Sequence, residues 1–169
     1  FTDAGKIRSV FANCSTLRVI YVSNMIERKG YRVLANAYIG MGANVQRRMQ
    51  ISFAGRFEDE MAKTQFMQLI SPYPGIKYLG VVEGEEKRLL FEGAHIFCLP
   101  TTYFEGQPIS ILEAYSAGTV VVTTGQSGIL DVFQDSLNGF QLVDSSAESI
   151  RLTLTSLLDR EKELLAIAI

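Results

Sequence analysis

The sequence predicts an α/β fold with a doubly wound, mainly parallel, six-stranded sheet of the Rossmann-like type. Short apolar runs rich in β-branched residues alternate with segments whose apolar residues recur at helical spacing. The strand runs are almost continuously apolar, which is typical of parallel strands that are buried on both faces. In such a sheet ligands bind beyond the carboxyl ends of the strands, so the loops that follow strands are the candidate site.

The strands and helices can be placed from these runs and from the Gly and Pro residues between them. We expect strands at residues 17–22, 49–54, 76–79, 96–99, 119–123 and 140–143. We expect helices around residues 33–41, 62–70, 85–93, 108–117 and 129–133, and a long one from about 150 to 158 with Leu158 facing inward. Residues 1–16 show no clear period. They are interpreted as a lead-in to one domain that spans residues 17–169.

Composition excludes several classes of protein. The net charge is −2 with 16 basic residues that are scattered along the chain, so nothing favours a nucleic-acid partner. No apolar run approaches the ~20 residues needed to span a bilayer, and no signal peptide is visible. Cys14 and Cys98 have no metal-ligand spacing and are expected to be reduced thiols in a cytoplasmic protein. The chain begins without Met, so we expect it to be part of a longer protein.

The stretch from residue 103 to 124 combines several signals for a binding site. Pro108 fits the first position of a helix and Gly118 fits its left-handed C-terminal cap. Ile111, Leu112 and Tyr115 would form the apolar stripe of that helix. The helix would begin beside a loop that contains glycine, with free N–H groups that suit an anion.

Charged residues in these loops add two chemical demands. Lys29, with Arg28 before it, follows the first strand, and Gly30 allows close approach of the backbone. Lys29 is either a solvated surface cation or a partner for a diphosphate. Glu105 and Glu113 would repel a phosphate, but carboxylates are good acceptors for vicinal hydroxyls. A diphosphate between two polyols, as in a nucleotide sugar, satisfies both demands.

Other candidate features favour structural roles. Gly40 and Gly42 lie at the end of a predicted helix, so they do not form a dinucleotide fingerprint. His95 is the only histidine, stands at a strand entrance and is expected to cap or pack. Tyr103, Phe104 and Tyr115 are expected to belong to the core or to a pocket wall.

The chain resembles a known family at these residues. Residues 94–124 read AHIFCLPTTYFEGQPISILEAYSAGTVVVTT. This run resembles the donor-binding signature of the group 1 (family four) retaining glycosyltransferases of the GT-B fold, with Glu-Gly-x-Pro followed by Glu-Ala. Residues 22–30 (VSNMIERKG) resemble the loop of that family after its first strand, and residues 127–140 its Gly-Gly to Asn-Gly stretch.

The resemblance implies a role for each matching position. Glu105 would contact the transferred sugar, Glu113 would bind the ribose, and Lys29 would bind the diphosphate and stabilise the leaving nucleotide. The further donor-binding residues implied are Asn24, Arg28, Gly106, Gln107, Pro108, Ile109 and Ser110. The substrate would be a UDP- or GDP-sugar, with no cofactor and no divalent metal. Backbone contacts near residues 76–80 are expected to read the base.

The sequence departs from the family pattern at several positions. Asn24 replaces the usual Arg and brings no charge, so Arg28 could complete the phosphate clamp. His95 stands at the usual Asp position, Ser127 at the usual first Gly of the pair, and Asp131 at the usual Glu.

The resemblance covers only the second half of a GT-B enzyme. An acceptor-binding domain would precede residue 1, would be the partner of this domain, and could bring peripheral contact with the inner face of the cell membrane. The chain alone is then expected to bind donor weakly and to transfer little. The whole enzyme would build a surface polysaccharide, lipopolysaccharide or glycolipid. A non-catalytic nucleotide-sugar or nucleotide module, which Asn24 favours, and a nucleotide-sugar epimerase are the alternatives.

Overall fold

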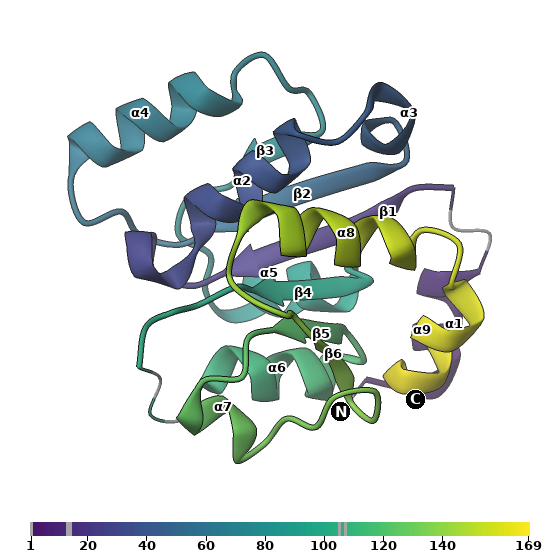
Figure 1. Cartoon of the computed structure of the whole chain (residues 1–169). Helices are drawn as coiled ribbons and strands as arrows, with labels where there is room; N and C mark the ends of the chain where they lie inside the picture. Colours follow the sequence, from purple (N-terminus) through teal and green to yellow (C-terminus); the bar gives the residue numbers. More distant parts are fainter. Residues whose placement is uncertain (1, 13–14, 105, 107) are drawn as a thin grey trace.

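The computed structural model describes residues 2–12, 15–104, 106 and 108–169. Six parallel strands form one sheet in the order β3-β2-β1-β4-β5-β6 (Figure 1). The strands are β1 (Leu17–Val22), β2 (Met49–Ala54), β3 (Ile76–Tyr78), β4 (Ile96–Leu99), β5 (Val120–Thr123) and β6 (Gly139–Gln141). The predicted fold class is confirmed.

Helices cover both faces of the sheet. They are α1 (Ala4–Phe11), α2 (Tyr31–Ile39), α3 (Ala43–Gln46), α4 (Glu60–Ile70), α5 (Gly84–Glu92), α6 (Ile109–Ala117), α7 (Ser127–Leu130), α8 (Ala147–Leu157) and α9 (Glu161–Ala168), with a 3₁₀ turn, η1, at Glu27–Lys29. Helix α2 packs against α8, α5 against α6, and α1 against α9 (Figure 1). None of the described helices is both long enough and apolar enough to cross a bilayer.

The core lies between the sheet and these helices. Strands β4 and β5 are buried along their whole length, as expected for parallel strands covered on both faces. Beside β2, the rings of Tyr31, Phe53, Phe57 and Phe66 pack with centroids 5.1–5.7 Å apart. This cluster joins α2 and α4 to the sheet and so fixes the loop that follows β1.

The chain changes direction between β1 and β4, which are neighbours at the centre of the sheet. From β1 it continues to β2 on one side, and from β4 it continues to β5 on the other. Gly30 has φ +83°, and a Cβ there would lie 2.5 Å from the carbonyl oxygen of Pro100. The N–H groups of Thr102 and Tyr103 both donate to the carbonyl oxygen of Arg28, at 2.8 and 3.1 Å. The two loops therefore meet at the place where such sheets bind ligands.

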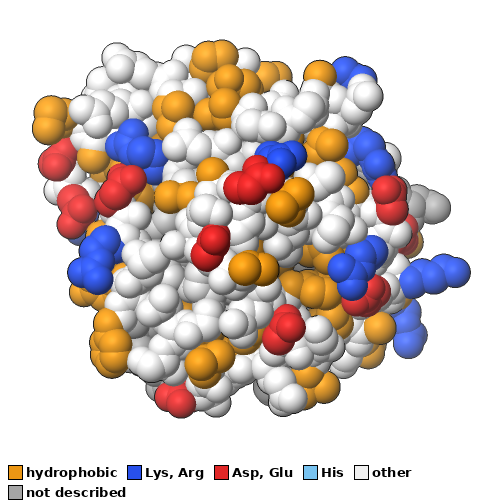
Figure 2. Space-filling view, in the orientation of Figure 1, with side chains coloured by type: hydrophobic (Ala, Val, Ile, Leu, Met, Phe, Trp, Pro, Cys, Tyr) orange, Lys and Arg blue, Asp and Glu red, His pale blue; other side chains and the backbone are white. Residues whose placement is uncertain are grey.

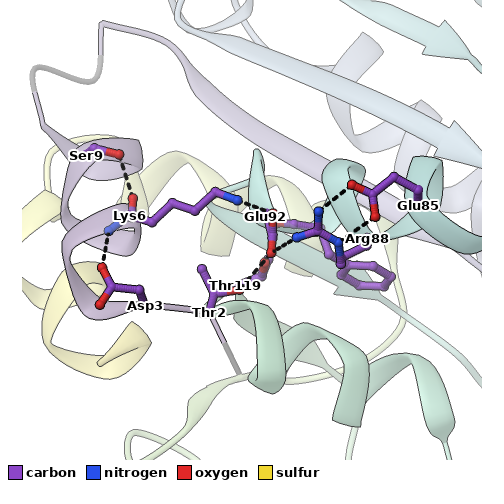
Figure 3. A network of polar contacts seen from close by, with 9 residues as sticks. Thr2, Asp3, Lys6, Ser9, Glu85, Arg88, Glu92 and Thr119 are labelled. Atoms are coloured by element: carbon purple, nitrogen blue, oxygen red, sulfur yellow. Dashed lines mark hydrogen bonds and ion pairs between the residues drawn. The ribbon is translucent and has the colours of Figure 1, made fainter.

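The segment before β1 forms a helix, α1, that was not predicted from the sequence. Asp3 caps α1 by accepting hydrogen bonds from the N–H groups of Gly5 and Lys6, and Ile7 and Phe11 are buried in the main core. Lys6 also reaches Glu92 of α5, where its Nζ lies 2.5 Å from Oε2 (Figure 3). Residues 2–12 thus pack on the same core as the strands.

Several other expectations need correction. The helix expected from about 150 to 158 is α8, and Leu158, at its C-cap, is half-buried against the core, whereas α9 was not expected. Leu112 is 40% exposed, because Ala114 and Ala117 face the core with Ile111 instead. Val143 lies beyond β6 and is 95% exposed. Tyr103 and Phe104 are exposed and not in the core, whereas Tyr115 packs against it.

His95 and Cys98 are buried, as expected for structural residues. The Nδ1 atom of His95 accepts the N–H of Arg18 at 2.9 Å, and its Nε2 lies 2.9 Å from the carbonyl oxygen of Val10. Burial raises the pKa of the Cys98 thiol above its usual range. The other cysteine, Cys14, lies outside the described residues.

Candidate functional site

A cleft of about 570 Å³ opens at the carboxyl edge of the sheet, beside the point where the connections that follow β1 and β4 leave in opposite directions. Its walls come from the loops after β1, β2 and β3 and from the first turns of α5 and α6. The described lining residues are Val22, Ser23, Asn24, Lys29, Ala54, Gly55, Val81, Val82, Glu83, Gly84, Lys87, Pro108, Ile109, Ser110 and Glu113. Two lysines and two glutamates among them give this lining no net charge.

The cleft gathers most of the predicted site residues that the structure describes. The predicted residues that line it are Asn24, Lys29, Pro108, Ile109, Ser110 and Glu113. Arg28 and Gly106 are described but are not among the lining residues. Glu105 and Gln107, which were also predicted, lie outside the described residues.

Lys29 reaches the cleft from the end of η1. Its Nζ lies 5.4 Å from the centroid of the Tyr103 ring, and the guanidinium carbon of Arg28 lies 5.8 Å from the same centroid. Both distances fall within the range of a cation–π contact. An exposed ring on the loop after β4 therefore gathers the two cations of the loop after β1. Tyr103 was predicted to belong to the core or to a pocket wall, and instead its exposed ring contacts the loop that carries Lys29.

Helix α6 directs its N-terminus at the same cleft. The helix begins at Ile109, one residue later than expected, because Pro108 is its N-cap residue and not its first helical residue. Gly118 closes it in the left-handed conformation, with φ 74°, as predicted. The N–H groups of Ile109 and Ser110 belong to the first turn, which provides no intrahelical acceptor for them. They can donate to an anion in the cleft.

Glu113 lies one turn further along α6 and is paired. Nζ of Lys87, on the first turn of α5, lies 2.7 Å from both carboxylate oxygens of Glu113. The geometry makes Oε1 the hydrogen-bond acceptor. Oε2 meets Nζ only as an ion pair and accepts no hydrogen bond from any donor in the described part of the chain. Both side chains are partly buried, with 28% of Lys87 and 35% of Glu113 exposed.

A second cavity of about 380 Å³ lies on the other side of this ion pair. It shares Gly84, Lys87 and Glu113 with the cleft and extends to Thr2, Arg88 and Glu92. Glu92 accepts hydrogen bonds from Lys6, Thr2 and Arg88 (Figure 3). The hydrogen bond from Lys6 is the main reason why the pKa of Glu92 is lowered. Glu92 and Arg88 in the lining of this cavity therefore already have structural partners.

Charge is distributed evenly over the rest of the surface that can be seen. On the face shown in Figure 2, acidic and basic side chains lie interspersed and form no large area of one sign. On α6, outside the lining of the cleft, the hydroxyl of Tyr115 forms no hydrogen bond with a described residue, and burial raises the pKa of Tyr115 to about 12.

Comparisons with known proteins show the family of this chain. A family model described as "Glycosyl transferases group 1" matches residues 16–160. O-antigen chain mannosyltransferase B of Escherichia coli is 30% identical over 118 residues, which make up 69% of this chain and 30% of the relative. The chain spans about a third of the length of the curated relatives it matches.

Solved structures share the fold. HepE of Anabaena, solved in complex with UDP-glucose, superposes with a TM-score of 0.80 at 18% identity, over 99% of this chain and 46% of that chain. The C-terminal domain of a group 1 glycosyl transferase family protein (LpcC) from Francisella tularensis gives a TM-score of 0.77 at 15% identity, over 99% of this chain and 93% of that one. At such identities the likeness shows the fold alone.

Sequence reasoning missed part of the cleft. Lys87, on α5, lines the cleft and was not predicted. Ser23, Gly55 and Glu83 also line it, and they lie in loops after strands, where the sequence predicted the site. Lys87 carried no such signal, because a lysine on a helix is most often a solvated surface residue.

Proposed function

Because the chain belongs to the group 1 glycosyltransferases, we propose that it is the donor-binding domain of a retaining enzyme. The enzyme transfers a sugar, most simply a hexose, from a nucleotide-diphosphate sugar to a glycan or a lipid-linked acceptor. One observation carries this proposal. Lys29, the N-terminus of α6 and Glu113 line one cleft at the centre of the sheet edge, and together they offer one end suited to an anion and another suited to hydroxyls.

The anionic end of the donor would lie against Lys29 and the first turn of α6. An ammonium and two first-turn N–H groups neutralise a diphosphate. They also act more strongly as negative charge grows on the departing nucleotide, which makes them the main source of catalytic stabilisation in this half. Asn24 can donate a hydrogen bond to a phosphate oxygen but adds no charge.

The hydroxyl-bearing ends of the donor would meet the two glutamates. Glu113 would accept from the ribose hydroxyls, and its Oε2, which has no described hydrogen-bond donor, has the capacity to do so. Glu105 would hold the hydroxyls of the transferred sugar. Residues 76–80, where base contacts were expected, do not line the cleft, so the backbone of Val81 and Val82, which do line it, would read the base instead. HepE is complexed with UDP-glucose, which supports a UDP-sugar and leaves a GDP-sugar to be tested beside it.

The remainder of the enzyme would supply the acceptor site. Relatives that act on O-antigen and colanic acid support a surface polysaccharide or lipopolysaccharide as the product class. The acceptor domain would also bring any contact with the inner face of the membrane. We therefore expect this chain alone to bind donor and to transfer little. Lys29 and the amides of α6 would replace a divalent cation, so EDTA should leave donor binding unchanged.

The test is a titration of the chain with UDP, GDP and uridine, by calorimetry or by NMR. Wild type should bind one nucleoside diphosphate more tightly than uridine. Glu113→Ala should weaken its binding by about 1–3 kcal/mol, because ribose hydroxyls lose a buried partner. Lys29→Met should weaken the binding of the nucleoside diphosphate and leave the affinity for uridine unchanged. Glu86→Ala removes an exposed carboxylate from α5 outside the cleft and is the matched control.

Unchanged affinity in Glu113→Ala would exclude the ribose assignment. A wild-type chain that binds none of the three ligands would exclude the donor-binding function.

A non-catalytic nucleotide-sugar module is the second candidate, and Asn24 favours it because the clamp loses a charge. The two candidates differ in the full-length protein. An enzyme should lose most of its transfer rate in Glu105→Ala, whereas a binding module has no transfer rate to lose.

A further inference from the structure

We propose that Lys87 is a positioning residue for Glu113, and that the pair sets the preference of the cleft for ribonucleotides over 2′-deoxyribonucleotides. The inference rests on the proposed function and adds to it a residue that the motif does not contain. Lys87 comes from α5 and Glu113 from α6, and the two helices pack together on one face of the sheet. Their ion pair therefore links two elements at the wall of the cleft.

The contact is specific in its geometry. Nζ of Lys87 lies 2.7 Å from Oε1 and 2.7 Å from Oε2 of Glu113, so it bridges the carboxylate. A carboxylate held at both oxygens by a partly buried ammonium has little freedom to rotate. Glu113 and Lys87 both line the cleft and the second cavity, so the pair stands in the partition between them.

Hydrogen-bond capacity remains on the carboxylate after this contact. A carboxylate offers about four acceptor positions, and Lys87 takes one hydrogen bond at Oε1. Oε2 is buried in ion-pair contact with Nζ but accepts no hydrogen bond from a described donor, so it keeps acceptor capacity. A ligand hydroxyl would satisfy it.

Lys87 also solves an electrostatic problem. The donor carries a diphosphate, and an uncompensated carboxylate near it would repel it. An ammonium in contact with Glu113 cancels that charge while leaving its acceptor atoms in place. Without Lys87 the carboxylate would be both free to rotate and repulsive, so binding would weaken and the discrimination of the 2′-hydroxyl would fall.

A different role for Lys87 makes a different prediction. If Lys87 only added positive charge for the diphosphate, its removal would weaken the binding of ribonucleotides and deoxyribonucleotides by the same factor. The ratio of the two dissociation constants separates the two roles, because it cancels every contact that the ligands share.

The experiment measures the dissociation constants of UDP and 2′-deoxy-UDP, or of GDP and 2′-deoxy-GDP if the chain prefers guanine. In wild type the deoxynucleotide should bind at least about fivefold more weakly, the lower end of the cost of an unpaired hydrogen-bonding group. In Lys87→Met this ratio should fall below about twofold, with weaker binding of the ribonucleotide. Lys87→Arg should restore most of the ratio. Lys87→Gln is a second neutral variant should Lys87→Met fold poorly by circular dichroism.

Arg88→Met is the matched control. Arg88 is the next residue on α5 and pairs with Glu85 and Glu92, on the side of the second cavity and outside the lining of the cleft. It should keep the wild-type ratio. A wild-type ratio in Lys87→Met and Lys87→Gln, or equal weakening of both nucleotides, would overturn the positioning role while leaving the proposed function standing. Failure of wild type to bind any of these nucleotides would instead overturn the proposed function and this inference with it.

Discussion

At the scale of single residues, His95 shows how a buried polar side chain is committed to structure. Nδ1 accepts the N–H of Arg18, so in the neutral ring Nε2 carries the proton and donates it to the carbonyl oxygen of Val10. Burial of the ring lowers the pKa of His95 to about 4, because the charged form would lose its hydration. A protonated ring would also lose the Nδ1 acceptor.

The lowered pKa of His95 predicts a dependence of stability on pH. The folded pKa lies below the unfolded value of about 6.5, so the unfolded chain binds the proton first as the pH falls. The full contribution is present above pH 6.5 and is lost between pH 6.5 and 4, at up to about 1.4 kcal/mol per pH unit. Urea unfolding between pH 5 and 7.5 measures it, with His95→Gln as the reference that lacks this titration. An identical pH dependence in both proteins would contradict the assignment.

At the scale of elements, the crossing of the loops after β1 and β4 depends on Gly30. Its φ of +83° is left-handed, and a Cβ would lie 2.5 Å from the carbonyl oxygen of Pro100. Gly30→Ala should lower the free energy of unfolding by at least about 2 kcal/mol, since left-handed strain costs about 1–2 kcal/mol before the clash is counted. Gly42→Ala is the control, because nothing lies within 4 Å of a Cβ there and its φ is −65°.

The same pair of variants should differ in binding. Gly30 follows Lys29 directly, so relief of the clash must move the end of η1 and the ammonium with it. Nucleotide affinity should therefore fall in Gly30→Ala and stay unchanged in Gly42→Ala. Equal unfolding midpoints for the two variants in a urea titration would show that the crossing tolerates a side chain.

The helices and strands that were predicted correctly are those whose sequence signals lie within the element itself. The strands at 17–22, 49–54 and 96–99 match to the residue, because the signal for each is a short apolar run within the strand, and Gly55 and Pro100 directly follow the last two. The helix expected around 150–158 is present as α8, whereas α9 was not expected. Helix α1 buries only Ile7 and Phe11, a single pair at i and i+4, which is too short to establish a period. Its cap, Asp3, was the available signal.

The site divides in the same way. Lys29, Asn24 and the start of α6 were predictable because parallel topology brings the carboxyl ends of strands to one edge. Lys87 was not, because its partner Glu113 is 26 residues away and the pairing depends on how α5 packs on α6. Tyr103 was misjudged because aromatic residues are commonly buried, whereas this ring is 40% exposed and lies beside two cations.

At the scale of the whole molecule, the segment before β1 contacts both the middle of the chain and its C-terminal helix. Helix α1 packs against α9, and the ring of Phe11 lies edge-on to His95 with centroids 5.0 Å apart. The carbonyl oxygen of Ser116 accepts the N–H of Thr2 at 2.8 Å, and Lys6 meets Glu92 (Figure 3). The family model begins at residue 16 and so omits a helix that closes the core here.

A chain that begins at Ser15 should therefore be less stable than the whole chain. Ile7 and Phe11 are 7% and 1% exposed, and full burial of such side chains contributes about 1.5–3 kcal/mol each, so removal should cost about 3–6 kcal/mol. That is a large part of the 5–15 kcal/mol typical of a domain. Urea unfolding of the truncated and whole chains measures the loss, and the double substitution Ile7→Ala and Phe11→Ala in the whole chain should reproduce most of it. If the truncated chain kept the midpoint of the whole chain while the double variant lost stability, the two side chains would be acting through strain in α1 and not through closure of the core.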